Sequence, residues 1–135
     1  MRNASAAALA AALVAGVGCS GSDDATSIRL VVSDKNIRTE GVECAGAHPY
    51  QYVHAGATYA VEDGDGTVVA DGTLPAGDAE NAEPEIDWEV DRIPTFCGLE
   101  LDVDLPERSR YRLRLERGRP LAFVLTDEPV VLVVG

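Results

Sequence analysis

Residues 97–119 read CGLELDVDLPERSRYRLRLERGR, and this stretch decides the expected fold. Apolar side chains alternate with acids over 99–105 and with arginines over 110–115. Alternation with a period of two indicates β-strands with one apolar and one charged face. We therefore predict a hairpin that turns at Pro106-Glu107-Arg108. Its facing acid–arginine pairs would be Asp104–Arg110, Asp102–Arg112 and Glu100–Arg114, whereas a five-residue loop would pair Asp104 with Arg112 and Asp102 with Arg114.

The rest of the chain also favours short strands over helices. Asp63-Gly64-Asp65-Gly66 is typical of a hairpin turn between two strand-like runs. The acidic stretch 78–85 is expected to be a loop, and the unalternating run Val130–Val134 to be a strand covered on both faces. The expected strands are Ser27–Ser33, Gly41–Cys44, Ala57–Glu62, Thr67–Leu74, Ile86–Val90, Leu121–Thr126 and Val130–Val134. The pattern predicts an all-β fold over 27–135, an antiparallel immunoglobulin-like or transthyretin-like β-sandwich of about seven to nine strands.

The first 26 residues predict export. Residues 1–18 have the charge, apolar run and length of a signal peptide, and the run is too short to span a bilayer. Gly16-Val17-Gly18-Cys19 resembles a bacterial lipobox, with Gly16 where leucine is usual. We predict a lipoprotein signal peptide, lipidation at Cys19 and a flexible tether over 19–26. The alternative is an ordinary secretory signal, in which case the protein is secreted.

The net charge of the chain limits the classes of partner that its surface can bind. The sequence has 11 basic and 23 acidic residues, a net charge of −12. Removal of Arg2 with the signal leaves 10 − 23 = −13. So acidic a surface has no electrostatic reason to bind nucleic acid or anionic lipid. We therefore expect the protein to be held at the membrane only by acyl chains on Cys19. The expected location is extracytoplasmic, at the bacterial cell membrane.

Two further cysteines suit an oxidising compartment. We predict a disulfide between Cys44 and Cys97, which would restrict the unfolded chain by about 4 kcal/mol in the entropy model. The alternative is a thiol or metal site built from these cysteines with His48 and His54. Neither a Cys-x-x-Cys motif nor a zinc-type histidine spacing supports it.

Residues 44–118 carry a resemblance. The shared pattern is Cys44-x-Gly46, Tyr52, Gly56-Ala57, Val61-x-Asp63, Gly66, Ala70-x-Gly72-x-Leu74, Gly77, Cys97 and Tyr111-x-Leu113-x-Leu115. It resembles small, mostly uncharacterised exported or lipid-anchored β-sandwich proteins of high-GC Gram-positive bacteria. The resemblance implies a disulfide but no activity, and the acidic segment 78–91 departs from it.

Several motifs suggest sites, each with a simpler structural interpretation. Asp63-Gly64-Asp65 lacks the later ligands of a calcium loop, so a turn is favoured. The thirteen carboxylates between 39 and 91 suit a solvated face or weak cation binding. Arginines at 108–119 suit ion pairs with the neighbouring acids, although Arg117 and Arg119 lie beyond those acids and could meet segment 78–91. His48, Tyr50, Tyr52 and His54 share one parity and would form a stripe if extended.

These observations predict a binding protein rather than an enzyme. Serine-nucleophile, phosphate-loop and zinc-protease motifs are absent from the sequence. We expect a lipid-anchored, non-enzymatic interaction or envelope-associated module with no cofactor, no metal and an unknown protein partner. Its candidate interaction surface is His48, Tyr50, Tyr52, His54, Arg117 and Arg119. The alternative function is divalent-cation or copper-type metal binding, and a small hydrolase is a third option.

Overall fold

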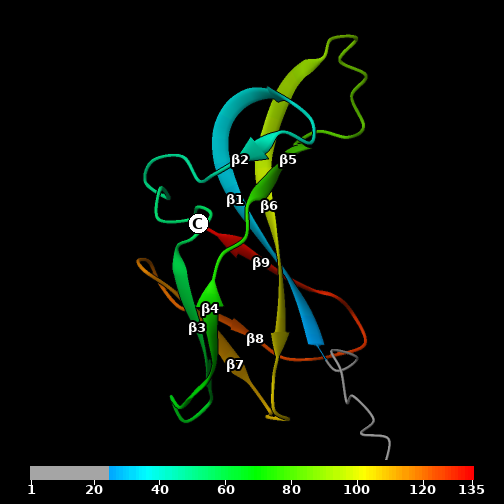
Figure 1. The fold of residues 1–135 in the computed structure, drawn as a ribbon. Coiled ribbons are helices and arrows are strands. Elements are labelled where there is room, and N and C mark those ends of the chain that lie inside the picture. Colours follow the sequence, from blue (N-terminus) through cyan, green and yellow to red (C-terminus); the bar gives the residue numbers. More distant parts are fainter. Residues whose placement is uncertain (1–24) are drawn as a thin grey trace, which may run out of the picture.

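The computed structural model describes residues 25–135, which form nine strands in two sheets and no helix (Figure 1). The five-stranded sheet has the order β2 (Glu43–Cys44), β5 (Gly77–Asn81), β6 (Arg92–Asp104), β1 (Ala25–Thr39) and β9 (Val130–Val134). The four-stranded sheet has the order β4 (Val68–Thr73), β3 (Thr58–Asp63), β7 (Tyr111–Leu115) and β8 (Leu121–Phe123). All neighbours are antiparallel except β1 and β9, which are parallel. The predicted all-β class is confirmed. None of the described residues forms a helix long and apolar enough to cross a membrane.

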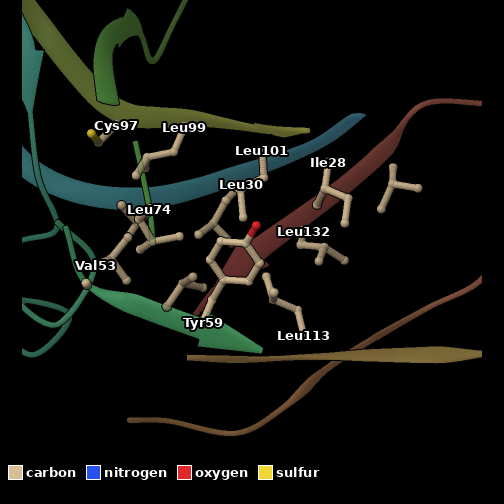
Figure 2. Packing of buried hydrophobic residues seen from close by; sticks show 14 of the residues in the cluster. Ile28, Leu30, Val53, Tyr59, Leu74, Cys97, Leu99, Leu101, Leu113 and Leu132 are labelled. Atoms are coloured by element: carbon tan, nitrogen blue, oxygen red, sulfur yellow. The ribbon is translucent and has the colours of Figure 1, made fainter. Parts of the chain in front are cut away.

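The two sheets share one hydrophobic core. Figure 2 shows Tyr59 and Leu113 of the four-stranded sheet pointing toward Leu30 and Leu132 of the five-stranded sheet. Leu30 and Leu113 are 0 % exposed. Because both sheets bury their alternate side chains in this layer, the arrangement is consistent with the predicted β-sandwich.

The hairpin predicted at 97–119 is wrong. Its two halves are both strands, but β6 pairs with β1 and β5 whereas β7 pairs with β3 and β8. The chain therefore crosses between sheets at 105–110. Tyr111 stabilises the crossing, because its hydroxyl donates a hydrogen bond to Pro106 O at 2.5 Å and accepts one from Arg108 N at 2.9 Å. Alternation identifies the face that is buried, but not the strand that lies alongside.

The charge pairs of that hairpin are accordingly replaced by others. Glu62 on β3 lies 2.7 Å from Arg114 and 3.7 Å from Arg112. On the other sheet, Glu100 lies 3.6 Å from Arg29 of β1. Each strand thus finds opposite charges within its own sheet, as cross-strand pairing favours.

The hairpin predicted around Asp63-Gly64-Asp65-Gly66 is confirmed as β3–β4. Gly66 has a φ of +84°, which a residue with a side chain rarely adopts. Asp63 accepts hydrogen bonds from Asp65 N at 2.9 Å and Thr67 N at 3.1 Å. Its carboxylate thus orders the turn.

Three other local predictions are corrected. Residues 86–90 are not a strand: Ile86 and Val90 are 46 % and 62 % exposed, and Asp87 accepts a hydrogen bond from Glu89 N in a local turn. The predicted loop 78–85 begins as strand β5. Strand β9 is covered on one face only, because Val131 and Val133 are exposed on a strand at the edge of its sheet.

The predicted disulfide between Cys44 and Cys97 is present and buried. It links β2 to β6 within the five-stranded sheet, with Cα atoms 5.7 Å apart. Gly77 of β5 lies beneath it, since a Cβ there would lie 2.5 Å from Cys97 Sγ. Glycine is therefore required for β5 to pass under the bridge.

Candidate functional site

The candidate site begins with the loop between β2 and β3, at residues 45–57. Val53 is 0 % exposed and anchors the loop in the core. Its backbone N donates to Tyr50 O at 3.0 Å, and its carbonyl accepts from Gly46 N at 2.8 Å. The loop is therefore a folded turn, so residues 48–54 are not extended and do not form the stripe that an extended chain would give. Tyr50 and Tyr52 are half-buried against the core rather than fully presented to solvent.

The turn between β7 and β8 meets this loop. Gly118 has a φ of +85°, and a Cβ there would lie 2.5 Å from Tyr52 Oη. Only glycine satisfies both the backbone conformation and the close approach of the phenol. The contact brings Arg117 and Arg119, which flank Gly118, beside the tyrosines.

Tyr50, Tyr52 and Arg119 line one pocket of about 420 Å³, here called the tyrosine–arginine pocket. Its other walls are Leu115, Gly118, Pro120, Leu121, Val134 and Gly135. Tyr52 also forms a wall of a second pocket of about 260 Å³, together with Arg117. Ligand sites combine apolar walls with a few polar groups in this way.

Arg119 is the cation of the tyrosine–arginine pocket. Neither it nor Arg117 makes an ion pair with any of residues 25–135, including the acidic segment 78–91 that was considered as a partner. Three other arginines of the 108–119 series are paired with acids of β3. They are Arg108, Arg112 and Arg114. The structural interpretation of the series thus applies to these three, with Asp63 and Glu62 as the acids.

A larger hollow of about 490 Å³ lies over Tyr59, Asp71 and Arg114. Burial, and then the charge of Asp71, raise the pKa of the Tyr59 hydroxyl. Two of its three charged groups already have partners: Arg114 pairs with Glu62, and Glu116 accepts a hydrogen bond from Thr58 N. We therefore regard this hollow as the weaker candidate.

The remaining predicted site residues do not join the pocket. His48 and His54 are exposed and line neither pocket, and His54 Nδ1 lies 2.9 Å from Ala55 O. Within residues 25–135 no three His, Cys, Asp or Glu side chains are grouped so as to hold a metal ion. Cys19, the predicted lipidation residue, lies outside the described residues, as do the predicted signal peptide and most of the tether.

The sequence analysis named the two tyrosines and Arg119 as candidates but did not predict the pocket that they line together. Leu115, Leu121 and Val134 were assigned only to strands, and Gly118 was not singled out. Arg117-Gly118-Arg119 does suggest a turn, but no periodicity links it to Tyr52, which lies far away in the sequence. The missing information was the order of the strands.

No family model, curated protein or solved structure matches this chain. The site is therefore interpreted from its own geometry.

Proposed function

We propose that this chain is an extracytoplasmic lipoprotein, anchored to the bacterial cell membrane through Cys19, that acts as a non-enzymatic interaction module. Its recognition site is the tyrosine–arginine pocket. The observation that carries the proposal is Arg119, a cation without an ion pair among the described residues, beside two phenols and an apolar floor.

The proposed address rests on the sequence of residues 1–26 and gains support from the disulfide. Disulfides such as Cys44–Cys97 form and persist in oxidising compartments outside the cytoplasm. Intact mass spectrometry of the chain from its native membrane fraction tests the address. We expect an acylated N-terminal Cys19 and the loss of two hydrogens at the disulfide. An unacylated mature chain cleaved elsewhere would contradict the anchor.

The fold type that we propose is immunoglobulin-like rather than transthyretin-like. The order β4-β3-β7-β8 corresponds to strands C′-C-F-G of that sandwich, and β5-β6-β1 corresponds to D-E-B. Tyr111, at the start of β7, hydrogen-bonds back to Pro106 in the manner of a tyrosine corner. Two features depart from the type: β9 takes the place of strand A in parallel orientation, and the disulfide lies within one sheet.

The chemistry of the pocket favours a carboxylate-bearing segment of a protein partner. A guanidinium can bind a carboxylate with two parallel hydrogen bonds. Tyr50 and Tyr52 offer hydroxyl groups, while Leu115 and Leu121 offer an apolar surface for a neighbouring side chain. The ligand class is therefore an acid next to an apolar residue.

Two peptides test this ligand class on the full chain by NMR. Acetyl-Leu-Glu-Leu-amide should shift the signals of Tyr50, Tyr52 and Leu115, and the glutamine peptide should bind about tenfold more weakly. Arg119→Gln should abolish the difference between the peptides. Arg110→Gln is the matched control, since Arg110 is an exposed arginine outside the pocket. Equal binding of both peptides, or shifts elsewhere, would overturn the assignment.

Gly118→Ala tests the shape of the pocket. The new methyl group would collide with Tyr52 Oη, so peptide binding should be lost. Gly41→Ala is the control, because Gly41 has a similar φ of +87° but nothing within 4 Å of its added Cβ. Both variants should lose about 1 kcal/mol of stability from backbone strain. Retained binding in Gly118→Ala would show that the pocket is not the site.

A further inference from the structure

Strand β9 is an unprotected edge of the five-stranded sheet. It pairs with β1 on one side only, and its sequence Val-Val-Leu-Val-Val has no charge, glycine or proline. The other edge strands are less able to pair with an added strand: β2 has 2 residues, β8 has 3, and β4 contains Asp71 and Gly72. Proteins commonly protect edges by such means, because an open edge is a template for another strand.

The free side of β9 has both polar and apolar groups to offer. Alternate residues of a strand direct N–H and C=O away from the neighbouring strand, here away from β1. No backbone hydrogen bond joins 130–134 to any described segment other than β1. Val131 and Val133 are 52 % and 64 % exposed, and Val124 and Leu125 are exposed in the preceding connection. An added strand would therefore gain a ladder and an apolar contact together.

Opposite charges flank the two ends of β9. At its end, Val134 and Gly135 share the tyrosine–arginine pocket with Arg119. Asp127 and Glu128 come just before its first residue. A parallel strand of the same sequence would place the acids of the two copies side by side. An antiparallel strand would instead place the acids of one copy near Arg119 of the other.

We propose that the occupant of this edge is a second copy of the chain, bound by antiparallel pairing of β9 with β9. Centred on Leu132, the pairing sets Val130 opposite Val134 and Val131 opposite Val133. This register uses all five residues and keeps inward and outward faces aligned across a two-fold axis. The two five-stranded sheets become one continuous sheet.

Because Glu128 lies just before β9 whereas Val134 and Gly135 line the tyrosine–arginine pocket, this register brings Glu128 of each copy toward the rim of the other copy's pocket. Glu128 of one copy then supplies the carboxylate that binds Arg119 of the other copy. Exposed apolar residues lie close to Glu128 in the chain. This contact rests on the proposed function, because it uses the same pocket. The strand pairing itself does not.

Sedimentation of the full chain, in detergent where it is acylated, tests the pairing. We expect two copies per particle, and a single copy for the double variant Val131→Glu with Val133→Glu. The control is Val68→Glu on edge strand β4, because Val68 is also 52 % exposed. Circular dichroism confirms that each variant is folded. A wild-type chain that stays single, or a dimer that tolerates both β9 substitutions, overturns the inference.

Cysteine crosslinking tests the register. An oxidised mixture of Val131→Cys and Val133→Cys chains should give a disulfide-linked pair, because the two positions face each other. Each variant alone should crosslink far less, since its two copies meet only diagonally. Equal crosslinking of a single variant with itself would contradict a centre at Leu132.

Charge exchange tests the Glu128–Arg119 contact separately. Arg119→Glu or Glu128→Arg alone should weaken dimerisation about tenfold, and the combination should restore it. Indifference to both would remove Glu128 as the occupant. Peptide titration of the single-copy Val131→Glu and Val133→Glu chain distinguishes the two proposals: peptide binding there, with no wild-type dimer, defeats only the pairing.

Discussion

Strands β6 and β7 have the same binary pattern of apolar and charged residues, but they pair with different strands. Each alternates apolar residues with charges of one sign, acids on β6 and arginines on β7. Such a pair would attract if it were adjacent, yet the strands lie in different sheets. β6 is fixed by the disulfide, by the long strand β1 on one side and by the short strand β5 on the other, while β7 is fixed by Tyr111 and the acids of β3. A charge match along the chain is therefore weaker than the core packing and covalent links that select neighbours.

The largest loss of stability is expected when the disulfide that holds β6 is removed. Cys44→Ser with Cys97→Ser should lower the free energy of unfolding by about 4 kcal/mol, because a loop closed across 53 residues is released in the unfolded chain. Urea unfolding of the wild-type and double variant measures it. Coincident unfolding curves would mean that packing with β1 and β5 alone holds β6 in place.

A smaller loss of stability is expected when the hydrogen bonds of Tyr111, at the start of β7, are removed. Tyr111→Phe leaves Pro106 O and Arg108 N without their partner at a buried ring, so it should cost about 1–3 kcal/mol. Tyr50→Phe is the control, since its hydroxyl makes no hydrogen bond to the described residues. Equal losses in the two variants would remove Tyr111 as the residue that fixes the crossing.

Double-mutant cycles distinguish the two possible neighbours of β7. Glu62→Ala and Arg114→Ala should couple by about 0.5 kcal/mol, as partly exposed cross-strand ion pairs do. Asp102→Ala and Arg112→Ala should show no coupling, because those residues lie in different sheets. Coupling in the second cycle and not in the first would restore the hairpin that the alternation suggests.

The smallest effect is confined to acid pH. Burial disfavours the charged form of Asp63, but hydrogen bonds from Asp65 and Thr67 and the nearby Arg108 prevail and lower its pKa. Its stabilisation is therefore complete above the ordinary value of 3.8 and is lost as the pH falls through the lower folded value. Asp63→Asn should flatten this acid-side loss of unfolding free energy. An identical slope in both proteins would contradict the shift.

The sequence was informative about faces and turns and poor about neighbours. The alternation of Leu99, Leu101 and Val103 correctly predicted their burial, and Asp63-Gly64 correctly predicted a hairpin. These features depend on residues close in sequence. The partner of β7 and the walls around Tyr52 depend on strand order, which is set by the packing of the whole core. Residues 86–90 alternate as well as any strand, yet local turns prevail there.

The disulfide also gives the chain a closed ring. Cys44 and Cys97 enclose β3, β4, β5 and the exposed acidic stretch 82–91. A protease that cuts within 82–91 opens the ring but releases no fragment, because both pieces stay joined through sulfur. The nicked protein keeps every strand on one covalent framework, and it separates into two pieces only when a reductant is present.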